Sequence, residues 1–188
     1  MQHRSLTVIE SWIRDGLLQV IYGPAATGKT HLALTFAEIA ARVHGKSCII
    51  ASEPGTALLL REAPPKGGVL AAYATTPEEL LSFTLRCTVR GAYTVIDTIN
   101  AFCDPTDVES YRYVSMTSAL LRSSRRGGAA FAQVRGEPYY PACWKAIIPW
   151  AEVVGETSKD GGRFVLRILK PIEALVTFRL TRGRAVWA

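Results

Sequence analysis

Side chains with amide groups are scarce in this sequence of 188 residues. Only Gln2, Gln19, Gln133 and Asn100 carry one, and arginine far outnumbers lysine. Because depletion of thermolabile residues is typical of proteins from hot environments, we expect a thermophilic source. Genome composition is an alternative cause of the arginine bias.

Paired cysteine motifs are missing as well. The four cysteines, Cys48, Cys87, Cys103 and Cys143, form no C-x-x-C pattern, so we expect neither a zinc site nor a redox motif of that type. Three of them lie in or beside apolar runs and are interpreted as small core residues. A thermophilic source would make an intracellular disulfide permissible.

Long hydrophobic runs are also absent. No apolar stretch reaches the roughly 20 residues that cross a bilayer, and the first ten residues contain no signal-peptide core. We therefore expect a cytoplasmic protein. The length suits one well-buried domain and is short for two, which predicts a single domain over residues 1–188.

The positive charge is concentrated in the last third of the chain. From Arg122 onward there are twelve basic residues and five acidic ones, in a protein whose formal net charge is +6. This excess is compatible with an anionic partner such as DNA. Alternatively, arginines on strands form a solvated face.

The segment GPAATGKT, residues 23–30, matches the G-x-x-x-x-G-K-[ST] phosphate loop. An apolar run precedes it, and apolar residues at helical spacing follow it until Gly45. In a strand-loop-helix unit, backbone N–H groups and the helix N-terminus face the phosphates. We therefore expect ATP here, with the Lys29 ammonium on the β and γ oxygens and the Thr30 hydroxyl on Mg²⁺.

The expected nucleotide-binding residues of this loop are Gly23, Pro24, Ala25, Ala26, Thr27, Gly28, Lys29, Thr30 and His31. The alternative is a turn rich in small residues before an ordinary helix. A full match in strand-loop-helix context is more specific than a glycine pattern alone, so we favour the phosphate loop.

Beyond the loop, strand-like runs alternate with helix-like ones. Strands are expected at 47–52, 69–74, 92–98 and 129–134, and helices at 77–86 and 107–123. Thr76, Pro77 and Glu79 form a capping-box helix start, whereas Glu53-Pro54-Gly55 indicates a turn. The alternation predicts an α/β fold with a mostly parallel, twisted sheet flanked by helices.

The end of the chain has a different pattern. Short alternating runs at 152–157, 163–169, 175–180 and 184–187 are typical of antiparallel strands. Ser158-Lys-Asp-Gly-Gly162 is interpreted as the turn that joins the first two. We therefore expect an antiparallel C-terminal strand extension at one edge of the parallel sheet.

Three polar residues come at the ends of predicted strands, where ligands of open α/β sheets bind. Asp97 has the position of a Mg²⁺-holding aspartate, Glu53 that of a base for the attacking water, and Gln133 that of a γ-phosphate sensor. The alternative for Asp97 and Glu53 is an ordinary solvated carboxylate at a strand end or turn.

These segments together resemble the ATPase core of the RecA/RadA recombinases. "IYGPAATGKT", "IIASEPG", "TVIDTINAF" and "FAQV" occur in the order and spacing of that core, and "RFVLRILKPIEALVTFRLTRG" is similar to its terminal strands in archaea. The resemblance covers about residues 6–187 and is nearest in size to archaeal RadB and other RadA paralogues. It implies a RecA-like P-loop NTPase core without an N-terminal DNA-binding domain.

The resemblance also implies roles for individual residues. ATP and Mg²⁺ are the implied cofactors, with Lys29, Glu53 and Gln133 as catalytic residues and with Thr30 and Asp97 as the metal-holding pair. Ala26, where such loops often have glycine, and Pro54, directly after Glu53, depart from the family pattern. These departures predict that hydrolysis is slow.

A second DNA-binding loop is implied at residues 135–145. Tyr139 and Tyr140 would stack on unpaired bases while Arg135 and Lys145 neutralise phosphates. The alternative is that two tyrosines and two prolines rigidify a short turn. The first DNA-binding loop, after Asp97, is short.

The implied function is a slow ATPase that modulates DNA repair and homologous recombination by binding DNA, with single-stranded DNA favoured, or a RadA-type recombinase. Alternatives are a non-catalytic, nucleotide-dependent adaptor, a KaiC-like signalling ATPase and, less favoured, a small-molecule P-loop kinase. A homo-oligomer is also compatible, because Lys170-Pro171 has the position of the family's ATP cap, which acts on a neighbouring subunit's nucleotide.

Overall fold

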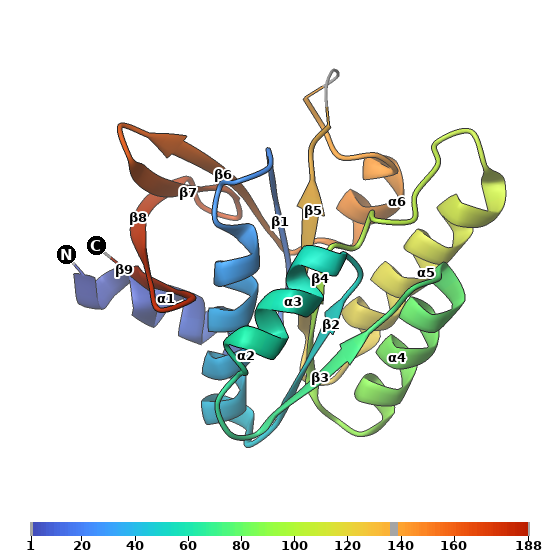
Figure 1. The fold of residues 1–188 in the computed structure, drawn as a ribbon, viewed down its shortest axis with the longest axis horizontal. Helices are drawn as coiled ribbons and strands as arrows, with labels where there is room; N and C mark the ends of the chain where they lie inside the picture. Colours follow the sequence, from blue (N-terminus) through green and yellow to red (C-terminus); the bar gives the residue numbers. More distant parts are fainter. Residues whose placement is uncertain (1, 136–138, 188) are drawn as a thin grey trace.

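The protein folds around one mixed β-sheet (Figure 1). The structure is a computed structural model and describes residues 2–135 and 139–187. The strands are β1 (Leu18–Gly23), β2 (Ser47–Ala51), β3 (Val69–Tyr73), β4 (Tyr93–Asp97), β5 (Gly128–Gln133), β6 (Val153–Asp160), β7 (Arg163–Lys170), β8 (Ala174–Thr181) and β9 (Arg184–Trp187). Their order across the sheet is β3-β2-β4-β5-β1-β6-β7-β8-β9.

The sheet has a parallel part and an antiparallel part. Neighbouring strands from β3 through to β6 pair in parallel, and β6, β7, β8 and β9 then pair antiparallel. This confirms the predicted α/β class with a mostly parallel sheet and an antiparallel C-terminal extension.

Helices cover both faces of the sheet (Figure 1). They are α1 (Gln2–Arg14), α2 (Lys29–His44), α3 (Pro54–Glu62), α4 (Pro77–Val89), α5 (Val108–Ser123), α6 (Trp144–Ile147) and the 3₁₀-helix η1 (Ile148–Trp150). Residues of α1, α2 and α3 pack into one apolar core, and residues of α4, α5 and α6 pack into another. No helix within the described ranges is long and apolar enough to cross a membrane.

Strand β1 shows why the parallel strands have continuous apolar runs. Ile21 faces the core of α1 and α2, whereas Val20 and Tyr22 face the core of α4 to α6. A strand between two helical layers is buried on both faces, so it cannot carry the polar alternation of a half-exposed strand. The terminal strands β7 and β8 have many exposed positions and alternate accordingly.

Several predicted ends are confirmed. Helix α2 is followed by Gly45 in the left-handed conformation, with φ of 80°, and the Thr76 hydroxyl accepts a hydrogen bond from the Glu79 N–H at 3.2 Å. The hairpin turn is tighter than expected, because β6 continues to Asp160 and leaves Gly161 and Gly162, both at positive φ, as the connection.

The turn predicted at Glu53-Pro54-Gly55 is wrong, since helix α3 begins at Pro54. Proline lacks the N–H that has no partner in a first helical turn, and its fixed φ suits that position. Helix α1 and the short helix α6 were also not predicted, because α1 precedes the first recognisable motif and α6 is one turn long.

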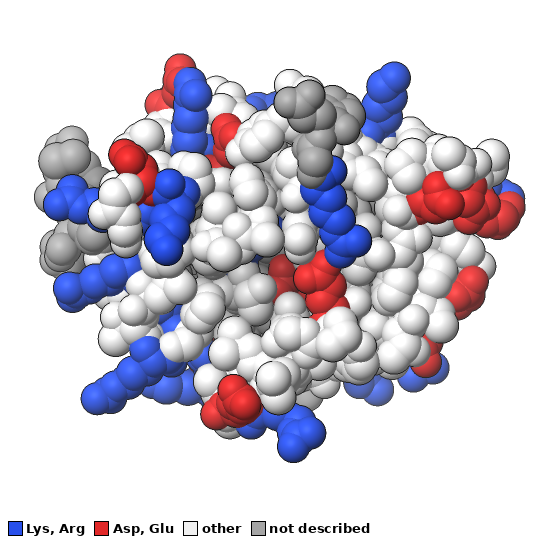
Figure 2. Space-filling view, turned by 45° about the horizontal axis from the view of Figure 1, so that its top comes forward, with Lys and Arg blue, Asp and Glu red and all other residues white. Residues whose placement is uncertain are grey.

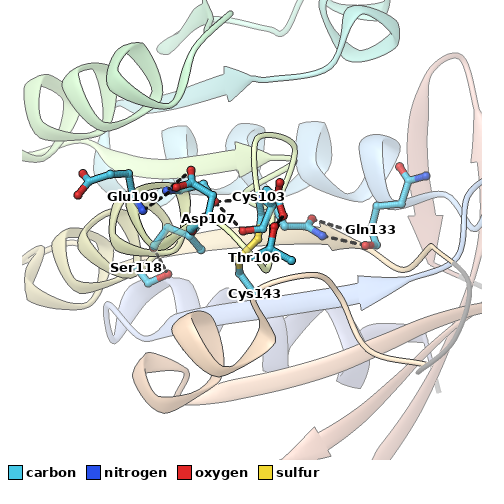
Figure 3. Close-up of a disulfide and its surroundings, with 11 residues drawn as sticks. Cys103, Thr106, Asp107, Glu109, Ser118, Gln133 and Cys143 are labelled. Atoms are coloured by element: carbon cyan, nitrogen blue, oxygen red, sulfur yellow. Dashed lines mark hydrogen bonds between the residues drawn. A yellow bond between two sulfur atoms is a disulfide. The ribbon is translucent and has the colours of Figure 1, made fainter.

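Two cysteines form a disulfide that the spacing of the cysteines does not predict. Cys103, in the loop after β4, bonds to Cys143, directly before α6 (Figure 3). Cys48 is a buried residue of β2, as expected for a small core side chain, and Cys87 is half-buried on α4. The disulfide joins two loops that follow neighbouring strands, β4 and β5.

Candidate nucleotide site

The carboxyl ends of four parallel strands meet around one cavity of about 400 Å³. The phosphate-loop segment follows β1, Glu53 follows β2, and Asp97 and Gln133 end β4 and β5. The lining consists of Ala25, Ala26, Gly28, Lys29, Thr30, His31, Glu53, Asp97, Thr98, Gln133 and Leu180. The structure therefore brings together candidate residues from four separate segments, although Gly23, Pro24 and Thr27 are not among the lining residues.

The Lys29 side chain lies within the curve of the loop. Its Nζ donates hydrogen bonds to the carbonyl oxygens of Gly23, at 2.9 Å, and Pro24, at 2.5 Å. An ammonium has three N–H donors, so one remains for a ligand in the cavity. Burial lowers the pKa of Lys29, while the carboxylates of Asp97 and Glu53 act in the opposite direction.

Ala26 has φ of 60°, in the left-handed region that glycine occupies without strain. The position therefore has a conformation that glycine adopts more readily than alanine. Gly28 also has positive φ, of 83°, and a side chain would not fit there, because a Cβ would lie 2.9 Å from the Phe178 ring of β8.

Strand β6 holds the beginning of the loop. The Thr27 hydroxyl lies 2.7 Å from the Thr157 hydroxyl and donates to the Pro24 carbonyl at 2.8 Å. A Cβ on Gly23 would collide with Thr157. Gly23, Pro24 and Thr27 thus shape the loop, whereas the other residues from Ala25 to His31 line the cavity.

Asp97 is almost completely buried, with 1% of its surface exposed. Its Oδ2 accepts a hydrogen bond from the Thr56 hydroxyl at 2.8 Å, and its Oδ1 accepts one from Thr98 at 3.3 Å. Burial raises the pKa of Asp97, and hydrogen bonding from Thr30 and Thr56 and the Lys29 charge only partly oppose this. The carboxylate is thus held close to the Thr30 hydroxyl in a site that favours a compensating cation.

The donors at this point fit Mg²⁺. Thr30 and Asp97 offer hard oxygen ligands from two neighbouring elements, and both line the cavity. Within residues 2–135 and 139–187, no cluster of three or more His, Cys, Asp or Glu side chains has metal-binding geometry. Mg²⁺ bound with phosphates needs only one or two protein ligands and keeps several waters, so the pair suffices.

The Glu53 carboxylate forms an ion pair with an arginine. Its Oε1 accepts a hydrogen bond from Arg135 Nη2 at 3.1 Å. Glu53 is also the N-cap residue of α3, with an extended backbone. The residue expected to act as a base thus forms an ion pair with a residue expected to contact DNA.

Gln133 is positioned by Asn100, in the loop after β4. The Asn100 amide donates to the Gln133 carbonyl and accepts from the Gln133 N–H, both at 2.9 Å. Figure 3 shows the Gln133 side chain extending away from these backbone hydrogen bonds and from the disulfide. Gln133 is one of the residues that line the cavity.

A second cavity, of about 510 Å³, lies beside the first. It is lined by Pro105, Tyr111, Arg135, Tyr140, Pro141, Ala142, Cys143, Trp144 and Lys145. Three of the four predicted DNA contacts, Arg135, Tyr140 and Lys145, therefore share one surface. We refer to this surface as the aromatic pocket.

The fourth predicted DNA contact, Tyr139, lies outside this lining. Partial burial, with a hydrogen bond to Glu156, raises its pKa. Residues 136–138 of the predicted DNA-binding loop lie outside the described residues. DNA binding by Arg135, Tyr139, Tyr140 and Lys145 stays a prediction.

Basic side chains lie mainly on the half of the visible face that carries β6 to β9, while acidic ones are more frequent over α4 and α5 (Figure 2). Some of these arginines have acidic partners within the chain, such as Arg184 with Glu38. Lys170 donates to the Ala151 carbonyl at 2.7 Å. The predicted ATP-cap lysine thus has a partner in its own chain.

Sequence analysis missed Thr56, Asn100, Trp144 and Tyr111. Thr56 lies on the helix whose start was interpreted as a turn. Asn100 reaches the Gln133 backbone only because β4 lies beside β5. A useful signal was available for Asn100, because it is one of only four amide side chains in the chain and its buried position needs polar partners.

Comparisons with known proteins provide no assignment. No protein-family model matches this sequence, and no curated protein matches it.

Proposed function

We propose that this protein is a RecA/RadA-type P-loop ATPase core of the archaeal RadB kind, acting in the cytoplasm. In this proposal it binds Mg·ATP, hydrolyses it slowly, and modulates DNA repair and homologous recombination through single-stranded DNA or a RadA-type recombinase. One observation carries the proposal: Lys29 of the phosphate loop lines one cavity together with Asp97 and Gln133, which come from two other segments.

The order of the strands supports the proposal. Strands β1 and β4 are separated by β5, yet the phosphate loop after β1 and Asp97 at the end of β4 line the same cavity. Ligands of open α/β sheets bind outside the carboxyl ends of the strands. The cavity occupies that position.

The proposed chemistry assigns a step to each side chain. Lys29 would bind the β and γ phosphate oxygens, and Thr30 and Asp97 would hold Mg²⁺, which when bound offsets phosphate charge. Glu53 would take a proton from water as the water oxygen bonds to the γ phosphorus. The bond from that phosphorus to the bridging oxygen breaks, and ADP leaves with the electron pair.

Steady-state ATP turnover tests the proposal, measured with and without a single-stranded oligonucleotide at low salt and elevated temperature. We expect slow turnover that Lys29→Ala abolishes. Turnover that is unchanged in Lys29→Ala would contradict the proposal, since a contaminating ATPase would then be the source.

A non-catalytic, nucleotide-dependent adaptor is the second candidate. The ion pair between Glu53 and Arg135 favours it, because an engaged carboxylate is not available to a water. The Glu53→Gln variant distinguishes the two. Loss of turnover with ATP binding retained supports the enzyme, whereas ATP binding without turnover in both proteins supports the adaptor.

A further inference from the structure

Arg135 lies at the boundary between the two cavities. Its side chain lines the aromatic pocket, and its guanidinium bonds to Glu53, which lines the nucleotide cavity. Arg135 follows β5 by two residues, so it is attached directly to the strand that carries Gln133. A ligand that moves this guanidinium would change the surroundings of Glu53.

The aromatic pocket has the chemistry of a site for an unpaired base with its phosphate. The rings of Tyr140 and Trp144 are stacked, with centroids 6.0 Å apart and planes 19° apart, and Tyr22 of β1 packs against Trp144 at 4.9 Å. About half of the Tyr140 surface is exposed to solvent. Aromatic faces of this kind stack on any base.

The charges in the pocket complement the same ligand. Arg135 and Lys145 are the cationic residues of the lining, and no acidic residue is among the described residues that form it. A base attached to phosphate can contact both the rings and the cations, whereas a purely apolar ligand offers the cations no hydrogen-bond acceptor. Single-stranded nucleic acid is therefore the occupant that the pocket favours.

The ion pair that holds Glu53 is weak enough for such a ligand to displace it. The Arg135 side chain is 68% exposed and that of Glu53 28% exposed. Exposed pairs of this kind change an equilibrium constant by about fivefold at most. Arginine also forms strong, often two-pronged hydrogen bonds with phosphate, so a bound phosphate group competes well for the guanidinium.

We propose that Arg135 inhibits the nucleotide site by holding Glu53, and that single-stranded nucleic acid in the aromatic pocket releases it. The phosphate of the strand takes the guanidinium, and Glu53 then becomes free to accept the proton of the attacking water. This inference rests on the proposed function for its effect on turnover.

The first test is ATP turnover of Arg135→Ala with and without an oligodeoxythymidylate. We expect the basal turnover of the variant to rise severalfold toward the stimulated rate of the wild type, and the oligonucleotide to have no further effect. Arg42→Ala is the matched control, because Arg42 of α2 pairs with Glu10 of α1, and their side chains are 67% and 30% exposed, almost as in the pair of Arg135 with Glu53. A basal rate of Arg135→Ala at or below the wild-type rate overturns the proposal.

The second test needs no hydrolysis and so separates this inference from the proposed function. Energetic coupling is reciprocal, so removal of the Glu53 charge should release Arg135 to the nucleic acid. We expect Glu53→Gln to bind a fluorescein-labelled oligodeoxythymidylate up to about fivefold more tightly than the wild type, by anisotropy at fixed salt. Unchanged or weaker binding overturns the inference, even where the wild type turns over ATP.

A third experiment determines whether the pocket binds a nucleic-acid strand or a free nucleotide. Thymidine monophosphate offers the same ring and charge without a strand. Stimulation by the oligonucleotide alone, at equal nucleotide concentration, supports the assignment to nucleic acid. Equal stimulation by the monophosphate overturns that assignment in favour of a free nucleotide.

Discussion

At the scale of single residues, Ala26 shows how one backbone angle affects the phosphate loop. Its φ of 60° costs a residue with a Cβ about 1 to 2 kcal/mol, a cost that glycine avoids. Glycine also adds conformational freedom to the unfolded chain, which offsets about 0.4 to 1 kcal/mol of the stability gained by removing that cost. We therefore expect Ala26→Gly to raise the free energy of unfolding by roughly 1 kcal/mol or less.

Denaturant unfolding measures this effect, and Ala25→Gly is the matched control. Ala25 is the preceding loop residue and does not have positive φ, so glycine there brings only the entropic loss and should be destabilising. Equal effects of the two variants would show that the left-handed conformation of Ala26 is not maintained in solution.

Asp97 is a second single residue with a testable effect, because its contribution to folding stability depends on pH. Its raised pKa means that the folded protein binds this proton more tightly than the unfolded chain does. The Asp97 contribution to stability is therefore most favourable at low pH and is lost as the pH rises from about 3.8 through the raised folded pKa.

It follows that Asp97→Asn should unfold at a higher temperature than the wild type at neutral pH, in the absence of nucleotide and Mg²⁺. Asparagine keeps an oxygen that accepts the Thr56 hydrogen bond and removes the buried charge. Calorimetric melting at pH 7 and near pH 4 measures the difference, which should shrink at the lower pH. A variant that melts well below the wild type at pH 7 would contradict this explanation.

At the scale of elements, the disulfide between Cys103 and Cys143 connects the loops after β4 and β5 across 40 residues of chain. Closing a loop of that length in the unfolded chain contributes about 4 kcal/mol in the chain-entropy treatment. We expect Cys103→Ser to lower the free energy of unfolding by an amount of that order. Reductant should reproduce the loss in the wild type and have little effect on the variant, and a wild type insensitive to reductant would contradict this.

The elements also show why prediction from the sequence succeeded in some places and failed in others. The phosphate loop is a local pattern, and the ends of β4 and β5 follow from apolar runs, so Lys29, Asp97 and Gln133 could be found. Pro54-Gly55 is locally indistinguishable from a turn, and its use as a helix start was therefore missed. Thr56 was missed with it.

Partners across the sheet were beyond the reach of local patterns. The contact of Asn100 with Gln133 and the bond of Cys103 to Cys143 both depend on β4 lying beside β5. The pairing of Glu53 with Arg135 likewise joins loops 82 residues apart. Spacing along the chain carries no information on such neighbours until the strand order is known.

At the scale of the whole molecule, two cavities lie at the same edge of the parallel sheet, and their linings are joined through one ion pair. The C-terminal strands contribute to the first cavity through Leu180 and confine Gly28 through Phe178. The antiparallel extension is thus part of the site as well as of the fold. The proposed ATPase activity depends on the binding of Mg·ATP in the first cavity.

Titration calorimetry of the wild type with ATP, with and without Mg²⁺, tests that claim most directly. We predict one site per chain, tighter binding with Mg²⁺, and loss of binding in Lys29→Ala with the fold retained by circular dichroism. Absence of binding in the wild type, or equal binding by the folded Lys29→Ala variant, would contradict the account.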